Sequence, residues 1–253
     1  MEAIELKNLN FSYPLNSFEL KDISFSCDDK KIIGLAGPNG SGKSTLLKLI
    51  AGLEKPKNGE IFLKGKKLEN YKAIERAKII RWVGQEEITK NNYKVLEYLL
   101  LGGFPNYGFF GRYSKNDLMK AEEILEYFYL KNKKDWLVEN LSGGEKKLLK
   151  IGFCLISDPK IILLDEPFSH LDPIHLKNLF KIIKKEKEDG KTFIISSHEY
   201  NILRAISDYL LLLSEGEKIC FDEPQRIDLS LWEKTFKVSF FEKKQEQIIP
   251  DIF

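Results

Sequence analysis

Short apolar runs and longer amphipathic stretches alternate along the chain. Near the start, apolar and polar residues alternate at 4–6 and 23–27, which is typical of strands with one face in solvent. Uninterrupted apolar runs suit strands that are covered on both faces, and they occur at 32–36, 161–164, 193–195 and 210–213. Apolar residues recur at helical spacing at 44–51, 145–156 and 176–188. This order of strand, helix and strand predicts an α/β fold with a mostly parallel central sheet.

The segment 85–140 breaks this order. It is rich in aromatic residues and lysine, shows helical spacing at 118–130, and contains no apolar run typical of a buried strand. We interpret it as a helical subdomain inserted into the core, and we expect an antiparallel β subdomain at the N-terminus. The predicted divisions of a single domain spanning 1–253 are a core of 1–84 and 141–222, the helical subdomain of 85–140, and a C-terminal tail of 223–253 with no assigned role.

The composition is that of a soluble globular protein. Of 253 residues, 43% are hydrophobic and 31% are charged, and the net charge of +2 gives no reason to expect a nucleic-acid partner. No apolar run approaches the roughly 18 residues that would suggest a membrane span, so a membrane role would require a partner. The three cysteines (Cys27, Cys154 and Cys220) lack metal-ligand spacing and indicate neither a zinc site nor a disulfide framework.

Residues 37–44 read GPNGSGKS and fit the P-loop pattern in full. Glycines let backbone N–H groups approach an anion, and the helix that follows presents its positive end to phosphates. Lys43 supplies a cation for the β- and γ-phosphates, and the Ser44 hydroxyl can bind Mg²⁺. A glycine-rich turn could match by chance, but here a strand is predicted just before the motif and a helix just after it. The motif therefore predicts a P-loop NTPase core.

Two acids follow the apolar run 161–164. Ligands of open parallel sheets bind at the carboxyl ends of strands, so Asp165 and Glu166 are expected near the phosphates. Asp165 is the candidate for Mg²⁺, through water, and Glu166 is the candidate general base for an attacking water. Alone, the pair could be a solvated strand end. The P-loop makes the functional interpretation the stronger one.

A second anion-binding device is predicted at 141–145, which reads LSGGE. Ser142 looks like a helix N-cap, and Gly143 and Gly144 leave backbone N–H groups uncovered at the positive end of a helix. Taken alone, this segment could be no more than a well-capped helix. A chain with one P-loop has no evident use for a second such device.

Together and in this order, these motifs resemble those of the ATP-binding cassette (ABC) ATPases, and the resemblance covers nearly the whole chain. Gln85 stands at the position of that family's Q-loop glutamine, and Ser169–Asp172 (SHLD) resembles its D-loop. His198 follows a buried strand as the family's switch histidine does. Tyr13 stands where the family's adenine-stacking aromatic residue occurs. The resemblance implies the ABC ATPase fold, with ATP and Mg²⁺ as ligands.

In that family two ATPase domains pair head to tail, and the signature loop of one copy closes on ATP held by the P-loop of the other. The resemblance implies that Ser142, Gly143, Gly144 and Glu145 act in trans and that Asp172 of the D-loop helps to join the two sites. The implied catalytic residues are Lys43, Gln85, Glu166 and His198. The implied metal ligands are Ser44, Gln85 and Asp165. The implied nucleotide-binding residues are Tyr13, Gly37, Pro38, Asn39, Gly40, Ser41, Gly42, Lys43, Ser44 and Thr45.

The sequence departs from the family pattern in two places. Glu145 stands where the signature usually ends in glutamine, and its carboxylate adds negative charge near a triphosphate. The helix after it reads KKLLKIGFC at 146–154, where a basic, alanine-rich helix is usual. Both departures bear on the tightness of the closed dimer, and neither removes a catalytic group.

The segment 95–108 (VLEYLLLGGFPNYG) resembles the coupling region of importers for iron chelates, haem and cobalamin, where a helix follows as it does here near Asn116. Its apolar and aromatic residues could form a groove for a permease helix, or they could pack the subdomain's own core. The implied function is ATP hydrolysis that energises an importer of this type.

The resemblance also implies partners and a location. The partners would be a second copy of the chain, transmembrane permease subunits and an extracytoplasmic substrate-binding protein, at the cytoplasmic face of the cell membrane. The alternatives are the ATPase of an exporter, a soluble ABC protein of DNA repair, ribosome function or iron–sulfur assembly, and a regulatory module that no longer hydrolyses ATP. The intact Lys43, Asp165, Glu166 and His198 speak against the last.

Overall fold

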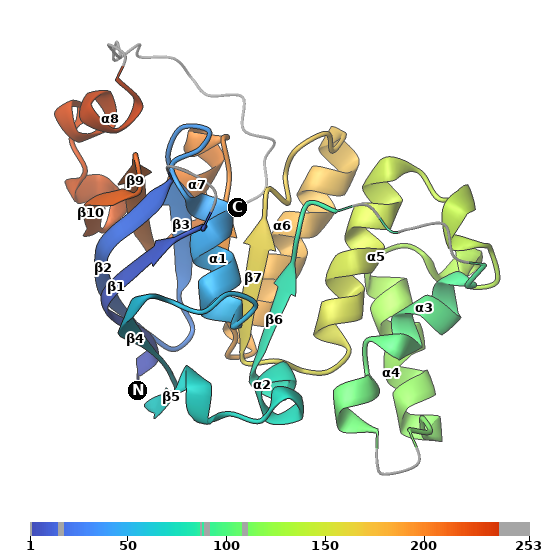
Figure 1. Cartoon of the computed structure of the whole chain (residues 1–253). Coiled ribbons are helices and arrows are strands. Elements are labelled where there is room, and N and C mark those ends of the chain that lie inside the picture. The colour runs from blue at the N-terminus through green and yellow to red at the C-terminus, as the bar shows by residue number, and fades with distance from the viewer. Residues whose placement is uncertain (1, 15–17, 87, 89–91, 108–110, 238–253) are drawn as a thin grey trace.

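The computed structural model describes residues 2–14, 18–86, 88, 92–107 and 111–237. Within them, one curled sheet has the strand order β5-β4-β1-β2-β10-β9-β3-β8-β7-β6 (Figure 1). The strands are β1 (Glu2–Ser12), β2 (Glu19–Asp28), β3 (Ile32–Ala36), β4 (Asn58–Leu63), β5 (Lys66–Lys67), β6 (Ile80–Val83), β7 (Ile161–Asp165), β8 (Thr192–Ser196), β9 (Tyr209–Ser214) and β10 (Glu217–Asp222). The helices are α1 (Lys43–Ala51), α2 (Ala73–Ile79), α3 (Val95–Leu101), α4 (Lys115–Tyr127), α5 (Gly143–Leu155), α6 (Pro173–Glu188), α7 (Tyr200–Ile206) and α8 (Leu229–Phe236).

The centre of the sheet is parallel, as predicted. β3 pairs in parallel with β8 and β9, and β7 pairs in parallel with β6 and β8. Every residue of β3, β7 and β8 is buried, which explains their uninterrupted apolar sequences. The register sets Asp165 opposite Ser196 and Leu35 opposite Ser196. The carboxyl ends of these three strands therefore meet at one edge.

The N-terminal part of the sheet is antiparallel, which confirms the predicted β subdomain. β1 pairs with both β2 and β4, and β4 pairs with β5. β10 runs antiparallel to β9 and joins the two parts of the sheet through one parallel bridge to β2, between Glu217 and Lys21. The sequence pattern did not predict β4, β5, β6 or β10. These strands are short and partly exposed, so their apolar pattern is weak.

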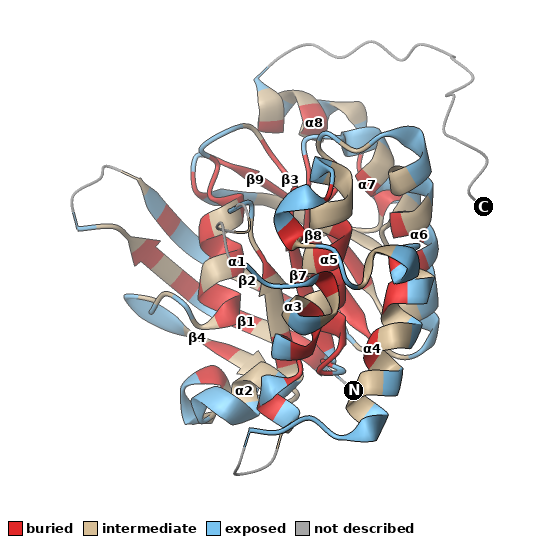
Figure 2. Cartoon of the chain, turned by 90° about the vertical axis from the view of Figure 1, so that its right-hand side faces the viewer, coloured by how far each residue is buried: buried red, intermediate tan, exposed pale blue. Residues whose placement is uncertain are grey.

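Two apolar clusters lie on opposite faces of the parallel strands. Along β3, Ile33 and Leu35 enter one cluster with α1 and the antiparallel strands, whereas Ile32 and Ala36 enter the other, with α5, α6 and α7. Figure 1 shows α1 enclosed between the antiparallel and the parallel strands, and Figure 2 shows buried residues running along the central strands and the inner sides of the helices. Both faces of the central sheet are thus covered.

The helical subdomain packs beside β6. α3 packs against α4 and α5, and α5 also packs against β6 and α6. In the described parts of 92–140, the only β pairing is an isolated bridge between Lys94 and Leu137. The predicted helix at 118–130 is found at 115–127, because Ser114 and Asp117 form a capping box that fixes its start.

Two further helices begin before their apolar pattern does. α5 begins at Gly143, directly after its cap Ser142, and α6 begins with Pro173 after its cap Asp172. The residues of their first turns are small, polar or exposed, so periodicity alone places both starts too late. α8, within the predicted tail, packs against β9 and β10 and buries Trp232. Residues 238–253 lie outside the described part. None of the described helices has the length and apolar character needed to cross a membrane.

Candidate nucleotide-binding site

The P-loop connects the end of β3 to the start of α1. Gly42 caps α1 with φ of 104°, and Gly37 has φ of 156°. A Cβ atom on Gly37 would lie 2.1 Å from the carbonyl oxygen of Leu213, and one on Gly42 would lie 2.7 Å from the Phe18 ring. A side chain at either position would need its neighbours to shift, so the path of the backbone favours glycine at Gly37 and Gly42.

Lys43 folds back across this loop. Its Nζ donates hydrogen bonds to the carbonyl oxygens of Gly37 at 2.8 Å and Pro38 at 3.2 Å. Burial lowers the pKa of Lys43 from its ordinary value, although the charges of Glu166 and Asp165 oppose that shift. The ammonium is therefore held over the loop in a largely dry place, where an anion would be attracted strongly.

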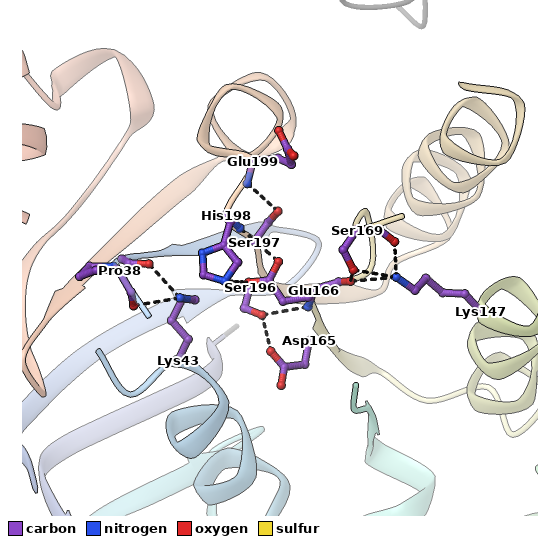
Figure 3. A network of polar contacts seen from close by, with 11 residues as sticks. Pro38, Lys43, Lys147, Asp165, Glu166, Ser169, Ser196, Ser197, His198 and Glu199 are labelled. Carbon is purple, nitrogen blue, oxygen red and sulfur yellow. Dashed lines mark hydrogen bonds and ion pairs between the residues drawn. The ribbon is translucent and has the colours of Figure 1, made fainter. Parts of the chain in front are cut away.

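The two acids at the end of β7 are organised by a buried hydroxyl. Ser196 Oγ donates to Asp165 Oδ1 at 2.6 Å and accepts a hydrogen bond from the backbone N–H of Glu166 at 3.0 Å (Figure 3). Asp165 and Glu166 are 6% and 8% exposed, and Ser196 is fully buried. The sequence reading missed Ser196, because a serine inside a buried strand carries no motif of its own.

Glu166 has a left-handed backbone conformation, with φ of 53°. Its Oε2 accepts a hydrogen bond from the backbone N–H of His198 at 3.1 Å. The His198 ring Nε2 also lies 3.1 Å from Oε1, but not in hydrogen-bond geometry, so this buried oxygen has no hydrogen-bond partner among the described residues. A carboxylate oxygen in this state is suited to accept a proton from a bound water.

A cavity of about 300 Å³ opens onto these groups. It brings together residues from the connection between β1 and β2, the P-loop and the start of α1, the Q-loop, and the segments that follow β7 and β8. The lining residues are Tyr13, Phe18, Asn39, Gly40, Gly42, Lys43, Ser44, Thr45, Gln85, Glu166 and His198. Phe18 is an addition to the predicted set. Gly37, Pro38, Ser41 and Asp165 are not among the residues that line the cavity.

The predicted magnesium ligands offer a hydroxyl, an amide and a carboxylate. Ser44 and Gln85 line the cavity, and Asp165 has one carboxylate oxygen, Oδ1, held by Ser196. Oxygen donors of this kind suit Mg²⁺, which keeps several waters of its own. The described residues hold no group of three or more His, Cys, Asp or Glu side chains that could bind a metal by themselves. The hydroxyl, amide and carboxylate oxygens of Ser44, Gln85 and Asp165 fit Mg²⁺ that is shared with water and phosphate.

The signature loop, 141–145, lies outside this cavity. Ser142 caps α5, as predicted: its Oγ accepts from the N–H of Glu145 at 3.3 Å, and Glu145 Oε2 accepts from the N–H of Ser142 at 3.1 Å. Ser142 and Gly143 are exposed, and a Cβ atom on Gly143 would meet nothing within 4 Å. The α5 N-terminus thus points into open space and contributes nothing to the chain's own cavity.

Asp172 of the D-loop is also outside the cavity and caps α6. Its Oδ1 accepts hydrogen bonds from the N–H groups of Ile174 and His175, each at 2.9 Å, and its Oδ2 lies 2.5 Å from His175 Nδ1. These hydrogen bonds lower the pKa of Asp172, that from the His175 N–H most of all. A Cβ atom on Gly144 would lie 3.0 Å from the same imidazole, so the D-loop and the signature loop are neighbours within one chain.

Two lysines of α5 link the signature helix to the site, and the sequence reading did not give them this role. Lys147 Nζ donates to the carbonyl oxygen of Ser169 at 2.6 Å and to that of Glu166 at 3.3 Å (Figure 3). Lys150 Nζ donates to the carbonyl oxygens of Gly84, at 2.7 Å, and Glu86. Since Gln85 lies between those two residues, Lys150 fixes the backbone on both sides of the Q-loop glutamine.

A second and larger cavity, of about 580 Å³, lies between the core and the helical subdomain. Leu53, Trp82, Tyr98 and Phe153 are among the residues that line it, together with Arg76, Arg81, Glu86 and Lys150. The predicted coupling segment has both buried and exposed apolar residues. Val95, Leu99 and Leu100 are buried, whereas Leu101 and Phe104 are 46% and 60% exposed. Gly108, the last residue of that segment, lies outside the described part.

Comparison with known proteins places these features in one family. A family model described as "ABC transporter" matches residues 20–169. An iron chelatin transport ATP-binding protein of Helicobacter pylori is 32% identical over 215 residues, which are 84% of each chain. An energy-coupling factor transporter ATP-binding protein of Methanococcus maripaludis is 31% identical over 230 residues, which are 90% of this chain and 81% of that one.

An ABC transporter ATP-binding protein of Bacillus cereus is 32% identical over 219 residues, and the aligned part spans 86% of this chain and 38% of the relative. The chain therefore spans well under half the length of that relative.

Solved structures give the same result. A metal-chelate type ABC transporter in an inward-facing conformation is 27% identical with a TM-score of 0.82, covering 94% of this chain and 90% of that one. A dimeric ATP-binding cassette in a post-hydrolysis state, bound to ADP and Pi, is 27% identical with a TM-score of 0.78, covering 88% and 100%. On these grounds, and on the P-loop, acid pair and signature loop described above, the chain belongs to the ABC transporter family as an ATP-binding cassette.

Proposed function

We propose that this chain hydrolyses ATP for a membrane transporter and that two copies enclose the ATP between them. The observation that carries the proposal is that the two predicted phosphate-binding elements of one chain do not meet in that chain. The cavity contains the P-loop, Glu166 and His198, whereas the exposed signature loop lies outside it. Two head-to-tail copies would bring each signature loop to the other copy's cavity. The dimeric relative with ADP and Pi supports such a pairing.

Each half of this composite site has a definable task. Lys43 and the N–H groups of the P-loop bind the phosphates, and the aromatic rings of Tyr13 and Phe18 offer a surface for the adenine. Oε1 of Glu166, which is buried and has no hydrogen-bond partner among the described residues, orients water and accepts its proton, while His198 lies beside it to contact the γ-phosphate. Mg²⁺, held through Ser44, Gln85 and Asp165, would neutralise charge on the phosphates.

The groove of about 580 Å³ is the proposed contact for a permease. Its apolar and aromatic walls suit an amphipathic helix, and exposed Leu53 and Phe104 add apolar surface near it. Lys150 lines this groove and also holds the Q-loop, so a segment bound there would act directly on Gln85. We propose that the chain is a peripheral subunit at the cytoplasmic face of the membrane.

The finer proposal is import of an iron chelate or a related compound, with an extracytoplasmic binding protein in the full system. It is supported by the coupling-like segment and by the names of the iron chelatin relative and the metal-chelate transporter. The energy-coupling factor relative is a transport ATPase of another type. Transport assays with a reconstituted permease and a labelled iron chelate would test it, and transport of other solutes alone would contradict it.

The catalytic proposal is tested by ATP turnover of the purified chain. Glu166→Gln should bind ATP but lose nearly all turnover, and Lys43→Ala should lose both, because the first removes the base and the second removes a phosphate contact. Glu188→Gln, on the last turn of α6, is the matched control and should behave as wild type. Wild-type turnover by Glu166→Gln would rule out its role as the base.

The permease proposal is tested by copurification with detergent-solubilised membrane proteins. Leu53→Arg, in the groove, should lose an integral membrane partner that the wild-type chain retains. Tyr129→Arg is the matched control, because Tyr129 is also an exposed apolar residue, at 62%, and does not line the groove. Equal recovery of the partner by both variants would place the contact elsewhere.

A further inference from the structure

A charged pair lies under the exposed tip of α5 and has no part in the chemistry above. Lys133, the last residue of the short 3-10 helix Lys131–Lys133, places its Nζ 2.6 Å from Oε1 of Glu145. The two side chains are only 23% and 15% exposed, so solvent screens their charges weakly. The Trp136 ring lies 4.8 Å from Nζ and flanks the lysine. The helical subdomain is thereby tied to the third residue of the signature helix.

Both oxygens of the Glu145 carboxylate are engaged within the chain. Oε1 accepts from Lys133, and Oε2 accepts from the N–H of Ser142. Burial raises the pKa of Glu145, but the hydrogen bonds from Lys133 and Ser142, together with the charge of Lys133, outweigh burial and lower it. Glu145 is therefore ionised, oriented and paired, and its charge is cancelled locally.

This cancellation matters because a triphosphate is strongly anionic. The donors left at the tip are the N–H groups of Gly143 and Gly144, which have no partner inside an α-helix, and the hydroxyl of Ser142. An unpaired carboxylate beside them would repel the phosphates. It would also be free to leave the N–H of Ser142 and loosen the cap.

We propose that Lys133 is a positioning residue for the second ATP contact: it cancels the charge of Glu145 and fixes the Ser142 cap, so that the α5 tip can receive the triphosphate held by another copy. This inference rests on the proposed function, because it requires that the tip meet ATP on that copy. It also accounts for glutamate at position 145, since a lysine from the helical subdomain compensates the charge that glutamine would not have.

The test compares four chains that all carry Glu166→Gln: the parent, Lys133→Gln, Glu145→Gln and the Lys133→Gln/Glu145→Gln double variant. ATP is titrated, and the dimer fraction is measured by analytical ultracentrifugation. Lys133→Gln should raise the ATP concentration for half-dimerisation about ten-fold, since it removes the hydrogen bond between two charged groups, Lys133 and Glu145. Adding Glu145→Gln should restore it to within about three-fold of the parent, because the amide carries no charge to compensate.

Two controls separate this role from a structural one. Lys131→Gln lies in the same 3-10 helix but pairs with the exposed Glu126, and it should match the parent. ATP affinity of the monomer, measured with a fluorescent analogue, should be equal in all chains, because Lys133 does not line the ATP cavity. Lost packing at Lys133 would not be repaired by Glu145→Gln, so recovery in the double variant identifies the charge as the cause.

The outcomes that overturn the inference differ from those that overturn the proposed function. If the parent dimerises with ATP and Lys133→Gln does so equally well, only the role of Lys133 is wrong. The same holds if the double variant is as defective as Lys133→Gln. If the parent does not dimerise with ATP, the proposed sandwich fails, and the role of Lys133 fails with it.

Discussion

Replacing Ser196 by alanine tests how the acid pair is held. The Ser196 hydroxyl is fully buried and serves two groups at once, as donor to Asp165 Oδ1 and acceptor from the N–H of Glu166. Ser196→Ala leaves the buried Oδ1 of Asp165 without this hydrogen bond. It also removes one of the two acceptors of the Glu166 N–H group. It also leaves the left-handed backbone of Glu166 with less support, although Glu166 N–H still has the carbonyl oxygen of Ser196 at 3.2 Å.

The magnitude follows from these contacts. Loss of a hydrogen bond to a charged carboxylate that stays buried costs about 2–3 kcal/mol, and the weakened contact to Glu166 brings the sum to about 3 kcal/mol. For a chain of this size, that lowers the unfolding temperature by about 6–12 °C. Because Asp165 would be less well oriented, the activity at limiting Mg²⁺ should fall about ten-fold or more.

The assays are chemical denaturation and ATPase activity over a range of MgCl₂ concentrations. Ser197→Ala is the matched control, since its hydroxyl accepts from the N–H of Glu199 at 3.0 Å and contacts neither acid. That variant should lose about 1 kcal/mol of stability and keep the wild-type Mg²⁺ dependence. An Ser196→Ala chain with unchanged unfolding free energy and unchanged Mg²⁺ dependence would refute the assignment of Ser196.

Three further predictions use other parts of the molecule. Lys150→Met should leave ATP binding intact but weaken the coupling of permease to turnover, seen as a loss of permease-stimulated ATPase activity, because it frees the backbone on both sides of Gln85. Burial lowers the pKa of Lys191, but hydrogen bonds from Lys191 to Glu186 and Asp158 outweigh burial and raise it. Protonated Lys191 thus stabilises the folded chain fully below the ordinary lysine pKa of about 10.4, and this stabilisation is lost as pH rises through the raised pKa. The loss of stability caused by Lys191→Met should therefore become smaller above about pH 10.5. Burial raises the pKa of Cys27 to about 12 and of Cys220 to about 11, so a maleimide at neutral pH should label the native chain slowly and the unfolded chain fast.

The parts of this fold that the sequence predicts are those with a strong local signature. The buried strands, the P-loop and the cap at Ser142 each follow from residues that are adjacent in the sequence. Ser196, Lys147 and Lys150 could not be found in this way. Their roles depend on which backbone or side-chain groups lie opposite them across the sheet or across the subdomain boundary.

Glu145 shows the same limit in another form. From the sequence, its carboxylate adds negative charge where a triphosphate is expected. The structure pairs it with Lys133, twelve residues away, through a contact between the signature helix and the helical subdomain. The resemblance to the family pattern identified the unusual residue, and only the tertiary contact supplied its counter-charge.

The central claim is that ATP lies between the P-loop of one copy and the signature loop of another. Asn39 and Ser142 are both exposed, so each can be replaced by cysteine, on separately tagged chains that also carry Glu166→Gln. A short bismaleimide should join an Asn39→Cys chain to a Ser142→Cys chain only when ATP is present. The central claim would be contradicted by a mixture that forms no such link with ATP, or by a chain carrying both cysteines that links only to itself.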